Sequence, residues 1–270
     1  MQGLYPRQVE TKDVFAWFQQ SVQLINRNFL NYLFSVLIFF GCLLAISQGI
    51  QLFAASAPAL VLLLVFLFAG VFVFYFFIAA LVVVSYCADH TESVTPSMVI
   101  QQFVSVQRAF LRMTISAVLL GLLYWYISVL MNPGSDISSM SEKTIALISK
   151  ESSVVFYAFK VSAMFLYFLL IVKFFLRTFF SVPLIVFHGL SYQEAKMLSH
   201  NGIIKNIRPM SYVMLVWFIA LSAATLFAPV LAIGLMPLFA TFGYVAYRHI
   251  YLGQGENSVA VKQCSVSAPG

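Results

Sequence analysis

The chain has 270 residues, of which 61% are hydrophobic and only 9% are charged. Soluble domains contain roughly 45–50% apolar and about 25% charged residues, so this composition excludes a soluble globular fold and indicates a membrane protein. The formal net charge is +6, and its distribution along the chain bears on orientation.

The first 28 residues read as an amphipathic helix. Phe18, Val22, Ile25 and Phe29 recur at spacings of four, three and four, and Arg27 closes the segment. The segment has no apolar core with a cleavage site, as a secretory signal would, so the first span is expected to stay in the mature protein. A helix with an apolar face and basic edges is expected to lie at the headgroup level.

The next stretch predicts two membrane spans. No charged residue occurs from Asn28 to Ala88, and a span needs about 20 apolar residues. Turn-forming residues between Ser47 and Pro58 divide the stretch into spans near 29–48 and 59–87.

A second amphipathic segment follows, with Val99, Phe103, Val106 and Phe110 at the same spacing. Thr95-Pro96 supplies an N-cap and a first-turn proline. Arg108 and Arg112 lead into a third span near 113–131, which ends at the turn cluster 132–134, and a fourth span is predicted near 154–176.

Lys160 lies about two turns inside the fourth predicted span. Intramembrane charges are rare and usually face a bundle interior or water, which would make Lys160 an anion or headgroup contact. The alternative is that its long side chain snorkels to the outer interface.

The third amphipathic segment predicts a surface helix over 191–206. Ser191 and Glu194 form a capping box, Gly202 is expected to weaken or end the helix, and Lys205 and Arg208 follow. Spans near 209–227 and 230–250 complete a set of six, and the tail 254–270 is expected to be a disordered cytoplasmic segment.

The last predicted span contains Gly234, Pro237 and Gly243. These residues could mark a broken helix at a binding site, or close helix packing with a kink. Tyrosines at two span ends resemble the aromatic belts of membrane interfaces: Tyr124 and Tyr126 beside Trp125, and then Tyr244, Tyr247 and Tyr251.

The sequence therefore predicts an all-α polytopic membrane protein with about six transmembrane helices in a single domain, 1–253. Arg27-Asn-Phe-Leu and Arg108-Ala-Phe-Leu share a pattern. Either a unit of one interfacial helix and one helical hairpin is used three times, or amphipathic connectors recur here without a repeat.

Lysine and arginine placement predicts orientation. In the six-span arrangement 12 of the 15 basic residues, and the whole net charge of +6, fall on one side. That side, which carries both termini, is expected to be cytoplasmic.

The segment after the fourth span carries a family resemblance. Phe180-Ser-Val-Pro-Leu-Ile-Val-Phe-His-Gly-Leu, then Glu194-Ala-Lys, Ser199 and Lys205-Asn206, resembles a poorly characterised family of six-span bacterial inner-membrane proteins. Its hallmark is an aromatic-His-Gly turn after a proline-containing apolar stretch, and its usual Arg-Asn is here Lys205-Asn206. The resemblance implies a multi-pass inner-membrane protein and no established activity.

Enzyme signatures are absent from the sequence: it has no Gly-x-Ser-x-Gly, His-Glu-x-x-His, phosphate-binding Gly-Lys-Ser/Thr or Gly-x-Gly-x-x-Gly motif. The four histidines fall at predicted cytoplasmic span ends, where they could meet in a zinc site or simply suit the interface. These four histidines are His90, His188, His200 and His249. We expect that no metal or cofactor is bound.

The leading hypothesis is a non-enzymatic inner-membrane protein that binds a lipid or a protein partner, with a transporter of a small molecule or lipid as the alternative. No Asp or Glu lies inside a predicted span, which counts against an ion-driven pump. The expected partners are anionic lipids of the cytoplasmic leaflet, or another membrane protein, and not nucleic acid. Six basic residues are candidate contacts to such a partner: Arg27, Arg108, Arg112, Lys160, Lys205 and Arg208.

Overall fold

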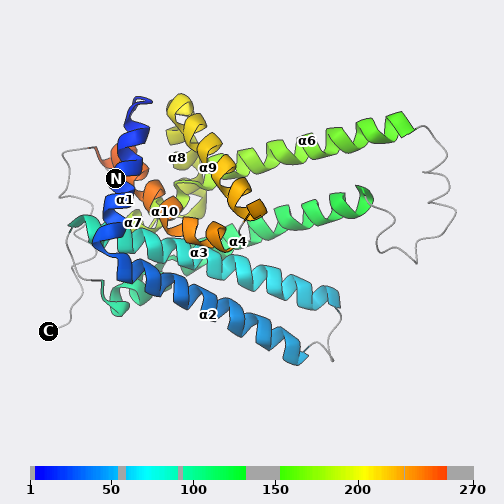
Figure 1. Ribbon diagram of the computed structural model, residues 1–270, viewed down its shortest axis with the longest axis horizontal. Coiled ribbons are helices and arrows are strands. Elements are labelled where there is room, and N and C mark those ends of the chain that lie inside the picture. Colours follow the sequence, from blue (N-terminus) through cyan, green and yellow to red (C-terminus); the bar gives the residue numbers. More distant parts are fainter. Residues whose placement is uncertain (1–3, 54–58, 91–93, 132–152, 228, 254–270) are drawn as a thin grey trace. The chain divides into compact units, whose positions relative to one another are not determined.

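The computed structural model describes residues 4–53, 59–90, 94–131, 153–227 and 229–253. These residues are helical over most of their length and contain no strand (Figure 1). Five helical segments are long and apolar enough to cross a membrane: Phe29–Leu52, Leu64–His90, Val106–Tyr124, Val161–His188 and Ile207–Ala224. The prediction of an all-α polytopic membrane protein is therefore confirmed.

The first two spans form a hairpin of α2 (Phe29–Phe53) and α3 (Ala59–His90), which lie side by side (Figure 1). Helix α2 continues through Ser47, Gln48 and Gly49, beyond the expected end of the first span near residue 48. Helical hydrogen bonding satisfies the backbone where water is scarce, so a few polar side chains do not end a span.

Asparagine marks two of the points where an amphipathic helix meets a span. Helix α1 (Asp13–Arg27) ends at Asn28, and α8 (Tyr192–Lys205) ends at Asn206. The two asparagines have nearly the same backbone angles, φ −125° with ψ 34° and φ −116° with ψ 36°. Helix α2 starts directly after Asn28, and α9 (Ile207–Phe227) starts directly after Asn206.

At the third junction between an amphipathic segment and a span, the helix has no break. Helix α4 (Pro96–Met131) runs without interruption from the amphipathic segment into the third span, so the expectation of a separate interfacial helix there was wrong. In the Arg-x-Phe-Leu pattern, Ala109 stands where Asn28 stands in the first unit. Alanine has the highest helix propensity, whereas an asparagine side chain competes for backbone hydrogen bonds, so alanine favours continuation of the helix at this point.

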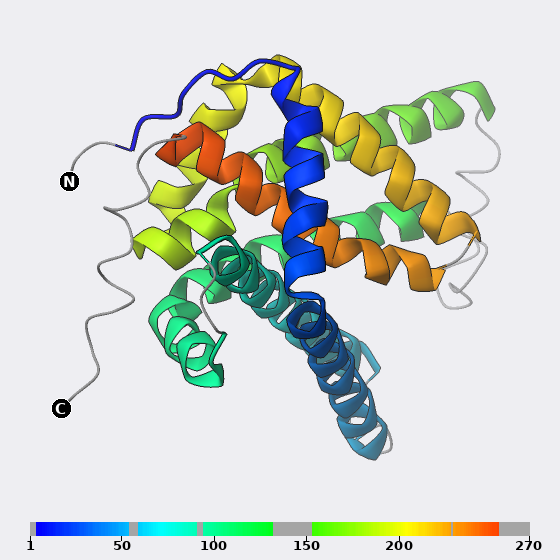
Figure 2. The same cartoon turned by 60° about the vertical axis from the view of Figure 1, so that its left-hand side comes forward.

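The amphipathic segments pack in a repeating order. Helix α1 lies across α10 (Pro229–Tyr247), where Trp17 meets Phe242 at 6.0 Å between ring centroids (Figure 2). Phe110 of α4 meets Phe76 of α3 at 5.3 Å, and α8 packs on α7 (Ser181–His188). Each amphipathic segment thus contacts the last helix of the hairpin that precedes it in the chain. Helix α1 has no preceding hairpin and contacts α10, the last helix of the final hairpin.

The family-like segment forms the short helix α7, whose residues from Ser181 to Val186 are buried. It follows α6 (Ser153–Thr178) after a two-residue break, and Ser199 of α8 bonds to that break by accepting from the Phe180 N–H at 3.1 Å. Gly189 ends α7 with φ +61°, a left-handed conformation that favours glycine.

The predicted helix over 191–206 is confirmed as α8, and so is its capping box between Ser191 and Glu194. Hydrogen bonds from the Ser191 hydroxyl and its backbone N–H hold the pKa of Glu194 below its ordinary value. Of the two expectations for Gly202, the one that it ends the helix was wrong, because α8 continues to Lys205. A Cβ at Gly202 would lie 2.1 Å from the hydroxyl oxygen of Tyr251, so glycine lets that tyrosine approach and donate to the Leu198 carbonyl.

The last hairpin consists of α9 and α10, and α10 continues through Pro237 into a π-helical turn, η1 (Arg248–Leu252). The helix is therefore not broken at Pro237. The expected interface belt of Tyr244, Tyr247 and Tyr251 was also wrong, because all three side chains are at most 5% exposed. They form a buried aromatic cluster with Phe187 and Phe180.

Three hydroxyls join this hairpin to the first. Tyr32 of α2, Ser85 of α3 and Thr241 of α10 form a closed triangle of hydrogen bonds at 2.9, 3.1 and 3.1 Å. All three side chains are buried, and polar groups of this kind hold helices together in a membrane.

Residues 115–175 form a second compact unit, in which Tyr124 of α4 meets Tyr167 of α6 at 5.0 Å between ring centroids. Several predictions lie outside the described residues: the turn at 132–134, the polar segment after it and the tail 254–270. The same holds for the side chains of Trp125 and Lys160, although both residues lie in described helices.

Candidate functional site

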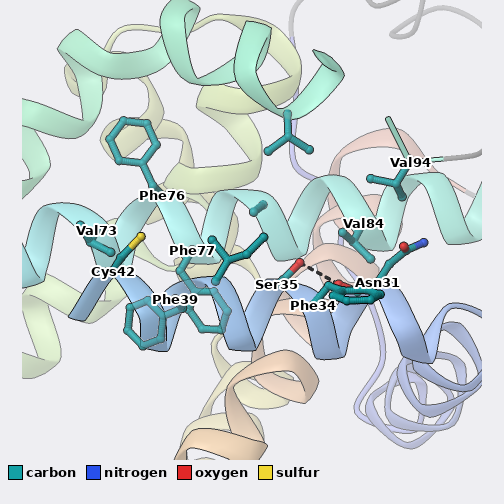
Figure 3. A pocket seen from close by; sticks show the side chains of 13 residues that line it. Asn31, Phe34, Ser35, Phe39, Cys42, Val73, Phe76, Phe77, Val84 and Val94 are labelled. Atoms are coloured by element: carbon teal, nitrogen blue, oxygen red, sulfur yellow. Dashed lines mark hydrogen bonds between the residues drawn. The ribbon is translucent and has the colours of Figure 1, made fainter. Parts of the chain in front are cut away.

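A groove of about 580 Å³ lies between α2, α3 and the residues that open α4 (Figure 3). Ligand pockets typically measure 300–1,000 Å³. The lining consists almost entirely of apolar side chains: Phe34, Ile38, Phe39, Cys42, Val73, Phe76, Phe77, Ala80, Val84, Val94 and Val99, with Asn31 and Ser35 as the polar members.

The groove has a polar end and an apolar end. Asn31 lies at the end near Val84 and Val94, whereas Cys42 and Val73 lie at the other end (Figure 3). Ser35 donates its hydroxyl to the backbone carbonyl of Asn31 at 2.8 Å, which satisfies that hydroxyl within the helix. The Asn31 side-chain amide makes no hydrogen bond within the described part of the chain.

The basic residues predicted as contacts differ in their surroundings. Arg27 and Arg108 are exposed, and Arg27 is the last residue of α1, directly before the break that leads to the polar end of the groove. Arg208 is exposed in the first turn of α9. Arg112 is exposed on α4 and takes part in an interaction of its own.

Lys205 is engaged by the chain itself. Its Nζ donates to the Pro6 carbonyl at 2.7 Å, which uses one of the three donors of the ammonium group. The prediction for Lys160 lies outside the described side chains.

Beside Lys205, Asn206 holds the N-terminal segment. Its Oδ1 accepts from the Val9 N–H at 2.8 Å, and its Nδ2 donates to the carbonyls of Arg7 and Gly202, each at 2.9 Å. The Arg7 N–H donates to the Ile250 carbonyl at 2.7 Å. One nearly inaccessible side chain (1% exposed) thus ties the start of the chain to the α8–α9 junction.

A polar network joins the end of α3 to the start of η1 and to the middle of α1. Asp89 forms an ion pair with Arg248 and accepts from the Tyr244 hydroxyl at 3.0 Å. The second guanidinium nitrogen of Arg248 donates to the Gln20 side-chain carbonyl at 3.0 Å, and His249 contacts the same oxygen at 3.2 Å. These contacts fix how the three elements pack.

Three of the four histidines take separate partners, whereas the buried Nδ1 of His200 has no hydrogen-bond partner among the described residues. His90 stacks on Tyr86, His188 bonds to the Tyr247 hydroxyl and His249 contacts Gln20. Within the described ranges, no three His, Cys, Asp or Glu side chains form a group that could hold a metal ion. The zinc alternative therefore has no support from this geometry.

Comparisons with models of protein families, with curated proteins and with solved structures find no match for this chain. The resemblance to six-span bacterial inner-membrane proteins stays a prediction.

Sequence reasoning missed Asn31, Gln20 and the Asp89–Arg248 pair. Asn31 gives a local signal, since it is a lone amide at the start of an apolar span. Arg248 and Asp89 are 159 residues apart in sequence, and no local pattern around either residue predicts that they form a pair.

Proposed function

We propose that this protein is a non-enzymatic membrane protein that binds a membrane lipid, with one acyl chain in the groove between α2 and α3. The observation that carries the proposal is the lining of the groove, which is apolar along its length and polar at one end. A lipid has the same distribution of groups.

The length of the groove fits an acyl chain of one leaflet. Asn31 and Cys42 mark its ends along α2, and at a rise of 1.5 Å per residue they are about 16 Å apart. One leaflet contributes about 15 Å of the hydrocarbon core. A chain laid along the groove would therefore reach from the membrane surface to the midplane.

Lipid retained on purified protein tests the proposal. Native mass spectrometry in mild detergent should find one phospholipid bound per chain, and Ala80→Phe should remove it by filling the groove. Ala45→Phe is the matched control, because Ala45 is an exposed alanine of α2, the other helix of the hairpin, and does not line the groove. If Ala80→Phe retains as much lipid as the wild type, only annular lipid was present and the proposal is wrong.

The transporter alternative rested partly on Lys160, whose side chain is outside the described residues, so the geometry adds no support for it. Flux of a lipid or small molecule across liposomes that contain the protein would favour it over static binding.

We also propose that the membrane is the bacterial inner membrane and that both termini are cytoplasmic, as the distribution of lysine and arginine indicates. Cysteine labelling from outside intact cells should modify Ser139→Cys and should not modify Ser265→Cys, with Cys264 replaced by serine in both. Labelling of Ser265→Cys from the outside would reverse the assignment.

A further inference from the structure

The polar end of the groove has an unfilled hydrogen-bonding group. Asn31 lies in the first turn of α2, where its N–H donates to the Asn28 carbonyl at 3.0 Å. Its side-chain amide lines the groove and bonds to none of the described protein groups. An amide can donate two hydrogen bonds and accept others, so it suits the ester and glycerol oxygens of a lipid.

A cation precedes the polar end of the groove along the chain. Arg27 closes α1 four residues before Asn31, is exposed, and forms no ion pair or hydrogen bond within the described ranges. The neighbouring carboxylate at the end of α3, Asp89, is already neutralised by Arg248. Among the residues that the structure describes, Arg27 is thus a cation without a counter-ion.

Resting on the proposed lipid-binding function, we infer that the groove selects an anionic phospholipid of the cytoplasmic leaflet. Arg27 binds the negatively charged headgroup, Asn31 bonds to the ester region, and the acyl chain lies along α2 and α3. A guanidinium suits a phosphate because its donors match two phosphate oxygens at once.

The third unit offers an internal contrast. Lys205 occupies the position equivalent to Arg27, directly before the junction asparagine, but its ammonium donates to Pro6. Pro209 occupies the position equivalent to Asn31 and has no side-chain donor. The third unit therefore lacks the combination of an arginine and an amide that the first unit has.

A comparison of two photoactivatable phospholipids, each competing with unlabelled lipid, tests the inference. Phosphatidylglycerol and phosphatidylcholine, with the same diazirine-bearing acyl chain, are added separately to vesicles of unlabelled phosphatidylcholine that contain the protein. Labelling is then mapped to peptides of α2 and α3. One cation near an anionic lipid is worth about 1 kcal/mol, so phosphatidylglycerol should label these peptides about fivefold more.

The variants separate headgroup selection from occupancy of the groove. Arg27→Gln should bring the two lipids to equal labelling of the same peptides, and Asn31→Leu should lower labelling by both. Arg208→Gln removes an exposed cation from the other hairpin and should leave the preference unchanged.

The outcomes that would overturn each proposal are distinct. Equal labelling by both lipids in the wild type, or a preference that survives Arg27→Gln, overturns the inference while lipid binding stands. Labelling spread evenly over all spans, and unchanged in Ala80→Phe, identifies annular lipid only and overturns the proposed function as well.

Discussion

Replacing Arg248 with methionine should lower the free energy of unfolding by about 3 kcal/mol, because it removes the cation from a partly buried carboxylate. Asp89 is 17% exposed and Arg248 is 23% exposed. With Arg248 gone, Asp89 would keep only the Tyr244 hydroxyl among its described partners, and Gln20 would lose its guanidinium donor. Unfolding by sodium dodecyl sulfate in mixed micelles measures the change.

A second ion pair supplies the control. Lys12 and Glu10 form an exposed pair at 2.8 Å, with side chains 76% and 71% exposed. Exposed pairs contribute about 0–1 kcal/mol, so Lys12→Met should change stability very little. The double variant Asp89→Asn with Arg248→Met should recover part of the loss, because no uncompensated charge remains buried. A loss in Arg248→Met no larger than that in Lys12→Met would contradict this account of the network.

The spans were predictable because the membrane imposes a simple requirement. A helix must present about 20 apolar residues to the lipid, and charge-free runs such as Asn28 to Ala88 meet it without reference to the rest of the chain. The α8 capping box was predictable because it is local: its two residues, Ser191 and Glu194, are only three positions apart.

The helix junctions depended on one residue each, which is why their pattern was only partly foreseen. The helix is interrupted at Asn28 and at Asn206, whereas it continues through Ala109. The sequence shows these residues plainly, but amphipathic spacing alone treats the three segments alike. Helix propensities differ by at most about 0.7 kcal/mol between such residues, so tertiary packing also takes part in each outcome.

The polar contacts of the candidate site were hidden because they are long-range. Asn206 bonds to residues near the start of the chain, and Gln20 of α1 meets Arg248 of η1. The groove itself needs two spans and the start of a third helix to be in register before its lining exists. No local pattern indicates such a register, whereas the lone Asn31 in an apolar run can be recognised in advance.

Asn206→Ala should also destabilise the protein by about 3 kcal/mol. Three hydrogen bonds would be lost, and the N–H of Val9 and the carbonyls of Arg7 and Gly202 would lose their amide partner. A buried polar group left without a partner costs about 1–3 kcal/mol, and Asn206 is only 1% exposed. Asn206→Asp should destabilise the protein at least as much as alanine, because its buried carboxylate still accepts from Val9 but repels the two carbonyl oxygens.

Asn28→Ala is the matched control for this variant. Asn28 occupies the same junction with nearly the same backbone angles, yet its side chain makes no hydrogen bond to any residue that the structure describes. Hydrogen exchange adds a local readout, since the Val9 amide should exchange much faster in Asn206→Ala and at the wild-type rate in Asn28→Ala. If the two variants lose equal stability and neither changes exchange at Val9, then Asn206 acts only as a helix breaker. The attachment of the N-terminal segment would then have to depend on the Arg7–Ile250 and Lys205–Pro6 bonds instead.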